Sequence, residues 1–190
     1  MDALLEIMRK RRSIRKYTGE HVSEEDLKKI LQAGLLAPTG KNLKSAEFVV
    51  VRDRETLDKL ADSRSIGAAT LKGADAAIIV IGFSQIQDVW TEDCSIALTQ
   101  MHLMAASLGV GSVWIQSRLR QSAVAGKSTD EYLHELLGIP ADYCCEGILS
   151  LGMPDEAKDA YDLPDPAADA RVHAGKFDST NYDKIRLFGG

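Results

Sequence analysis

The residues with the clearest potential for binding chemistry lie between Arg9 and Lys16. Six of these eight residues are Arg or Lys, and Ser13 lies among them. The chain as a whole is acidic, with a formal net charge of −5, so a local basic segment indicates a local anion. Guanidinium groups suit a phosphate, which they can hold by two parallel, charge-assisted hydrogen bonds. The alternative is a solvated basic helix end that the helix dipole favours.

The remaining polar residues form no pattern typical of a catalytic or metal site. The histidines at positions 21, 102, 134 and 173 lack metal-ligand spacing, and His102 is interpreted as a hydrogen-bonded histidine of the core. Three cysteines are too few for a disulfide framework. We interpret Cys94, Cys144 and Cys145 as buried thiols in a reducing cytoplasm. The sequence therefore predicts no metal site, and it shows no Ser/His/Asp or Cys/His arrangement.

A segment at Gly126-Lys127-Ser128-Thr129 resembles the end of a nucleotide-binding P-loop. Gln121 stands where the first glycine of that motif is required, and no apolar strand precedes it. We reject a P-loop and expect Ser128 or Thr129 to cap a helix.

These residues need elements to position them, and the hydrophobic pattern predicts helices and strands in alternation. Helices are expected over residues 2–12, 24–35, 54–62, 92–108 and 129–137, and strands over 47–51, 74–82, 112–116 and 146–151. The second of these strands is almost continuously apolar, which is typical of a strand buried on both faces. Such an order predicts a layered structure of sheet and helices in one domain.

Composition and charge exclude several function classes. A pI near 5.4 argues against broad binding to nucleic acids or anionic membranes. The most apolar long stretch, Cys94 to Ile115, contains Thr99, Gln100 and His102, so it suits a buried helix and not a membrane span. The first residues include Asp2 and Glu6 and show no secretory pattern, so we expect a cytoplasmic protein.

The last part of the chain differs in composition. Residues 155–170 are rich in Asp, Ala and Pro and are expected to form an extended surface loop. Residues 171–190 contain too few apolar side chains for a core of their own. They are either disordered or lie across another surface, such as a partner subunit.

Three further segments accompany the Arg11-Arg12-Ser13-x-Arg15 element. They are APTGKN at 37–42, GVGSVWIQS at 109–117 and LGMP at 151–154. In this order and spacing they resemble the FMN-dependent nitroreductase family over residues 2–154. The resemblance implies an α+β fold, a three-layer α/β/α arrangement with a central mixed, mostly antiparallel sheet, in a homodimer with FMN at the subunit interface. It implies an FMN-binding domain at residues 1–154 and, at 155–190, a C-terminal loop and extension that packs on the partner subunit.

The same resemblance assigns roles to individual residues. Arg11 and Ser13 would bind the FMN phosphate and ribityl chain, with Arg12 close by, and Arg15 would reach the pyrimidine end of the flavin. The loop that touches the flavin of the other subunit would contribute Pro38, Thr39, Gly40 and Asn42. The strand end beside the reactive N5 edge would contribute Ile115, Gln116 and Ser117. Arg171, with Lys158 in reserve, would add to the phosphate contacts.

The implied activity is a ping-pong hydride transfer from NADH or NADPH, through FMN, to a small acceptor such as a nitroaromatic or quinone. The family loop commonly continues after its Asn as x-Gln-Pro-Trp, whereas residues 43–46 here are Leu-Lys-Ser-Ala. This departure leaves the acceptor open, with flavin reduction, enone reduction, dehalogenation and flavin breakdown as alternatives. A flavin-binding storage or sensing protein without turnover is the alternative from another class.

Overall fold

The computed structural model describes residues 2–167, 169, 171–173 and 175–177. The chain divides into two compact units, Met1–Ala160 and Tyr161–Gly190. The sequence places the corresponding boundary at 154/155. In the first unit, residues 155–160 form no helix or strand and are alternately exposed and half-buried. The expectation for the chain end, residues 178–190, lies outside the described residues.

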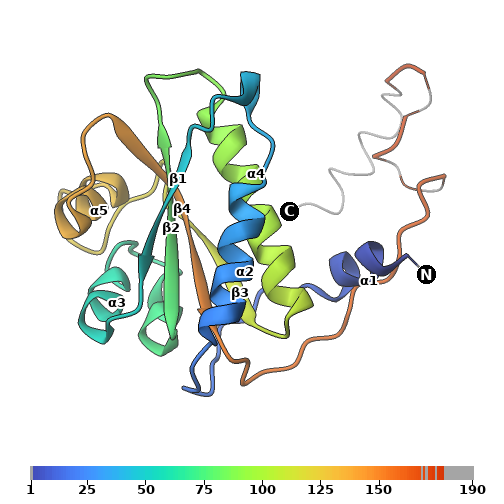
Figure 1. Cartoon of the computed structure of the whole chain (residues 1–190), viewed down its shortest axis with the longest axis horizontal. Helices are drawn as coiled ribbons and strands as arrows, with labels where there is room; N and C mark the ends of the chain where they lie inside the picture. The colour runs from blue at the N-terminus through green and yellow to red at the C-terminus, as the bar shows by residue number, and fades with distance from the viewer. Residues whose placement is uncertain (1, 168, 170, 174, 178–190) are drawn as a thin grey trace. The chain divides into compact units, whose positions relative to one another are not determined.

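The first unit is built on a four-stranded antiparallel sheet (Figure 1). Its strands are β1 (Ala46–Val51), β2 (Ala76–Phe83), β3 (Gly111–Gln116) and β4 (Tyr143–Gly152), in the order β1-β2-β4-β3. All three described strand pairings are antiparallel. Strand β2 is buried along nearly its whole length, which confirms the prediction of burial on both faces.

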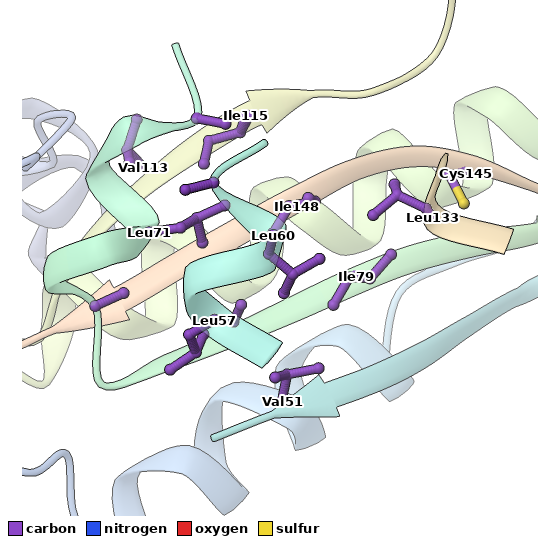
Figure 2. Packing of buried hydrophobic residues seen from close by; sticks show 14 of the residues in the cluster. Val51, Leu57, Leu60, Leu71, Ile79, Val113, Ile115, Leu133, Cys145 and Ile148 are labelled. Atoms are coloured by element: carbon purple, nitrogen blue, oxygen red, sulfur yellow. The ribbon is translucent and has the colours of Figure 1, made fainter. Parts of the chain in front are cut away.

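Helices cover both faces of this sheet, which confirms the expected α+β layered fold (Figure 1). On one face, α2 (Glu24–Leu35) and α4 (Trp90–Ser107) bury residues such as Ile30 and Met101. On the other face lie α3 (Arg54–Leu60), α5 (Thr129–Leu137) and the 3₁₀ turn η2 (Ala69–Gly73). Their side chains meet those of β2 and β4 in the cluster of Figure 2. Because each face has its own core, the sheet holds both helical layers at fixed positions.

Local sequence signals explain where several helices begin and end. Ser128 caps α5 in a reciprocal capping box with Glu131, and Gly138 ends the helix at a φ of 67°. The predicted cap at Ser128 is therefore confirmed. At α2, Ser23 accepts from the Asp26 backbone N–H, while the Asp26 carboxylate binds the Ser23 hydroxyl. The described contacts thus form a serine cap at α2. They do not include the second bond of a capping box, in which the Asp26 carboxylate would accept from the Ser23 backbone N–H.

Two expectations were wrong. The first helix, α1 (Ala3–Lys10), ends before Arg11 and not at Arg12, because Arg11 takes a ψ of 119° and leaves the helical region. Arg9 and Lys10 therefore form the last turn of α1, whereas residues 11–16 lie beyond the helix in neither helix nor strand. Cys144 is only half-buried, because it lies with Tyr143 at the outer end of β4, while Cys94 and Cys145 are buried as expected. Among the described residues, no helix is long and apolar enough to span a membrane.

Candidate functional site

The basic segment is held against the ends of β3 and β4 by backbone hydrogen bonds. The N–H of Ile14 donates to the carbonyl of Ser112 at 2.9 Å, and the N–H of Thr18 donates to that of Met153 at 2.9 Å. Tyr17 adds side-chain contacts, because its hydroxyl lies 3.0 Å from both the Ile14 carbonyl oxygen and the Ser150 hydroxyl. These contacts fix which residues of the segment face the sheet.

Two glycines allow this close approach. A Cβ at Gly152 would lie 2.6 Å from the ring of Tyr17, and one at Gly111 would lie 2.9 Å from the Ile14 side chain. Both distances are too short for real carbon contacts, so larger residues would displace the segment. Gly111 of the GVG motif and Gly152 of the LGMP motif therefore make room for the basic segment.

Arg11 is oriented by a histidine of α4. Its Nη1 donates to Nε2 of His102 at 2.9 Å, and His102 Nδ1 lies 2.6 Å from the Ser112 hydroxyl. Because a guanidinium can only donate, Nε2 must be the accepting nitrogen and the proton lies on Nδ1. Burial, together with the charge of Arg11, lowers the pKa of His102 to about 4. This confirms a hydrogen-bonded core histidine, and its neutral ring leaves the positive charge of Arg11 uncompensated by that contact.

Two more cations gather at the same segment. Arg12 donates to the backbone carbonyl of Asp159, and Lys158 Nζ donates to the carbonyl of Ser13 at 2.5 Å. Lys158 also lies 3.6 Å from the Glu156 carboxylate, which accepts from the Arg15 and Lys16 backbone N–H groups. We refer to Arg11, Arg12 and Lys158, around Ser13, as the cationic cluster.

Arg15 and Arg171 are the two remaining predicted cations. Arg15 is exposed at the outer side of the segment. Arg171 lies in the second unit and pairs with Asp169, to which its Nε donates at 2.8 Å. Lys158, the reserve candidate for an extra phosphate contact, lies in the first unit and donates to the Ser13 carbonyl.

The loop that contains Pro38 is organised around a buried carboxylate. Asp93, in the first turn of α4 and 2% exposed, accepts from the Gly40 N–H at 2.9 Å and from the Ser45 hydroxyl at 2.6 Å. Gln87 donates to the same carboxylate.

The loop also has internal constraints on its shape. The Thr39 hydroxyl accepts from the Lys44 N–H at 3.0 Å. Residues 41, 42 and 44 adopt positive φ values of 52°, 56° and 52°. Sequence reasoning missed Asp93 and Gln87, although an acid inside an apolar helix pattern was a usable signal.

The carboxyl end of β3 carries a chain of side-chain hydrogen bonds. The Trp114 indole N–H donates to Gln116 Oε1 at 3.0 Å, and Gln116 Nε2 donates to Glu146 Oε1 at 3.1 Å. Ser117 is buried, and its N–H donates to the Glu146 carbonyl at 3.1 Å. Ile115 points into the core, so only its backbone is available at this edge. Glu146 was also missed, although it opens the otherwise apolar run EGILSL.

These parts fit an elongated ligand with an anionic end. Ile14, which follows Ser13, bonds Ser112 at the start of β3, and Gln116 lies four residues further along the same strand. At about 3.4 Å per residue, this separates the two by about 14 Å. An anionic group at the cationic cluster and a flat ring beside Gln116 would match the shape and charge of FMN. The residues present therefore fit the flavin implied by the sequence resemblance.

Comparisons with known proteins agree with this architecture. An FMN-dependent nitroreductase from Clostridium difficile R20291 has a solved structure with a TM-score of 0.85 and 43% identity, covering 91% of this chain and 99% of that chain. A nitroreductase from Desulfovibrio desulfuricans, solved in complex with FMN, has a TM-score of 0.74 and 27% identity. The match covers 94% of this chain and 99% of that chain. The chain thus has the fold of nitroreductase structures.

Sequence comparison leads to the same class. A protein of Archaeoglobus fulgidus, named an NADH dehydrogenase/NAD(P)H nitroreductase, is 38% identical over 181 residues, which is 93% of this chain and 100% of the relative. The model of the nitroreductase family matches residues 8–82 and 68–153. The chain belongs to the nitroreductase family.

Proposed function

We propose that this oxidoreductase binds FMN and uses NADH or NADPH to reduce a small acceptor such as a nitroaromatic or quinone. The observation that carries the proposal is the cationic cluster, in which Arg11 is held by a neutral imidazole. Relatives named as NAD(P)H nitroreductase and as NADPH-flavin oxidoreductase support the same activity.

The residues would divide the ligand between them. Arg11, Arg12, Ser13 and Lys158 would hold the phosphate by charge-assisted hydrogen bonds. Arg15 would bring a positive charge toward the pyrimidine end, where it favours the reduced state. Gln116 and the backbone of Ile115 and Ser117 would border the ring edge. FMN, when bound, would supply the hydride-transfer chemistry, so no acid or base from the chain is required.

We propose further that two copies of the chain complete the site. The loop at Pro38, Thr39, Gly40 and Asn42 would reach the flavin bound by a second copy. An apolar groove of about 290 Å³ supports an interface at α1, α2 and α4. It is lined by Leu4, Ile7, Ala33, Leu36, Leu103 and Met104, among others. Covering this groove by a second copy would remove apolar surface from water.

An absorbance spectrum of the purified protein tests the proposal, repeated without oxygen after adding NADH and then NADPH. We expect flavin bands that bleach with at least one nicotinamide and return when a nitroaromatic or quinone is added. Parallel double-reciprocal plots at several acceptor concentrations would support ping-pong turnover.

Two results would decide against this function. Bound flavin that dithionite reduces but neither nicotinamide reduces would favour a storage or sensing protein. A colourless protein that takes up no added FMN would indicate that the cationic cluster is only a solvated basic segment. Rates with free flavin, enone and halogenated acceptors would identify which substrate class the loop at 43–46 accepts. A cytoplasmic location remains an expectation from the sequence.

A further inference from the structure

A second group of ligand-type side chains lies where α5 packs on β4. Asp130 and His134 are one helical turn apart on α5, and Cys145 lies on β4. Helix α5 covers the face of the sheet opposite to α4, whose His102 and Asp93 hold the parts of the proposed flavin site. Figure 2 shows the Cys145 sulfur at one end of the buried cluster, near Leu133. This group therefore has no part in the function proposed above.

The three side chains converge on one point. One ligand atom from each of Asp130, His134 and Cys145 lies within 4.8 Å of the others. The carboxylate of Asp130 is already oriented, because its Oδ1 accepts from the Cys145 backbone N–H at 2.7 Å. Its Oδ2 faces His134 Nε2 at 3.6 Å, which is too long for a hydrogen bond.

One atom of this group has no hydrogen-bond partner among the described residues. His134 Nε2 is shielded from solvent and makes no hydrogen bond with any described residue. Buried ring nitrogens normally have a partner, so an unpaired one needs an explanation. It lies 3.6 Å from a carboxylate oxygen of Asp130, and a ring nitrogen of His134 lies within 4.8 Å of the Cys145 sulfur, which is an arrangement that a metal ion would complete.

We propose that Asp130 Oδ2, His134 Nε2 and Cys145 Sγ bind a divalent cation of the zinc class. Sulfur, nitrogen and oxygen donors together suit Zn²⁺, whereas Mg²⁺ and Ca²⁺ prefer oxygen donors alone. Around a tetrahedral Zn²⁺ the ligand atoms are about 3.5 Å apart, so small side-chain rotations suffice. Water would take the fourth position from the side of Asp130, whose side chain is 39% exposed.

The binding step is a proton exchange without electron transfer. The Cys145 thiol releases its proton to water, and the sulfur then bonds to the metal. Burial raises the pKa of this thiol, so the positive charge of the metal would be what stabilises the thiolate. With ligands from α5 and β4, the ion would join the helix to the sheet.

The full-length, FMN-loaded protein, kept reduced, tests the site. It is incubated with ZnCl₂, desalted and analysed for zinc, and the bound metal is examined by X-ray absorption at the zinc edge. We expect about one zinc per chain, with one sulfur ligand at about 2.3 Å and nitrogen or oxygen ligands at about 2.0 Å. Zinc should also raise the thermal unfolding temperature.

Three variants separate this site from other thiols and imidazoles. The His134→Gln variant should fold, because the side chain that it changes is 19% exposed. It should bind zinc at least about 100-fold more weakly, which exceeds the loss typical of changing a residue that only contacts a metal ligand. Cys145→Ser should lose the sulfur contribution from the absorption spectrum. Cys144→Ser, one residue away, is the matched control and should behave as the unchanged protein.

Zinc that binds equally well to His134→Gln, or a sulfur ligand that disappears only in Cys144→Ser, would overturn the proposal. Failure of the unchanged protein to retain zinc would also overturn it. None of these results depends on flavin reduction, so the two proposals fail separately.

Discussion

The neutral state of His102 keeps the charge of the Arg11 guanidinium available for a ligand. A carboxylate in its place would neutralise that charge and compete with a phosphate. The histidine gives direction through one hydrogen bond, and Ser112 fixes its tautomer through another. The residue that binds the ligand and the residue that orients it therefore have distinct physical roles.

Replacing Arg11 with Ala should weaken FMN binding by roughly ten- to a hundredfold. The change removes a charge-assisted contact worth about 1.5–3 kcal/mol. Fluorescence titration of the flavin-free protein with FMN measures the effect. Arg120→Ala is the control, because Arg120 is exposed and its guanidinium bonds only the neighbouring Leu119 carbonyl among described partners. Unchanged affinity in Arg11→Ala would contradict the phosphate assignment.

His102 should make stability depend on pH between about 6.5 and about 4. The folded state holds its pKa near 4, below the ordinary value of 6.5, so the unfolded chain binds a proton first as pH falls. The free energy of unfolding should therefore decrease as pH is lowered through this range, by up to about 3 kcal/mol from this group.

Urea unfolding at pH 7.5 and pH 4.5 checks this, with His102→Gln for comparison. Glutamine can still donate and accept hydrogen bonds but does not titrate. The variant should lose less stability on acidification than the unchanged protein. Equal losses in both proteins would show that His102 contributes nothing to the pH dependence.

At the scale of elements, the sequence predicted the features that residues close together in the chain determine. The strands and helices are found close to their expected ranges, because apolar runs, caps and glycines act within a few positions. Tertiary partners were missed. Arg11 meets His102 across 91 positions and Gly40 meets Asp93 across 53, and no local pattern encodes such pairs. The sequence predicted His102 as a hydrogen-bonded core residue, but the local pattern of α4 does not name the partner of His102 or of Asp93.

The loop at 39–45 should lose its shape when Asp93 is replaced. Asp93→Ala leaves the Gly40 N–H and the Ser45 hydroxyl without their acceptor, which should cost about 2–3 kcal/mol of stability. FMN binding should weaken as well if the loop borders the flavin. Glu92→Ala is the matched control, because Glu92 is exposed and should change stability by less than about 0.5 kcal/mol. Chemical denaturation and flavin titration measure both effects, and a stable Asp93→Ala variant would show that the loop holds itself.

At the scale of the whole molecule, α1, α2 and α4 share an apolar surface that a single chain leaves exposed to water. Leu36 lines its groove and is 80% exposed. Leu36→Glu should therefore convert a dimer to a monomer and weaken FMN binding by about tenfold or more. Light scattering after gel filtration measures the mass.

Ile66 provides the comparison for this change. It is 79% exposed, follows α3 in the chain and lies outside the groove. Ile66→Glu should leave the mass and the flavin affinity unchanged. If the protein without substitutions is a monomer and still binds FMN tightly, the proposed site between two copies of the chain is contradicted.

The contact between Tyr17 and Gly152 has a consequence for how this chain can evolve. A side chain at position 152 would occupy the space of the Tyr17 ring, and a smaller residue at 17 would leave that space empty. Neither position can change freely while the other stays the same. Across the family, an aromatic residue at the first position should therefore be inherited together with glycine at the second, and lineages that lose one should be those that have lost the other.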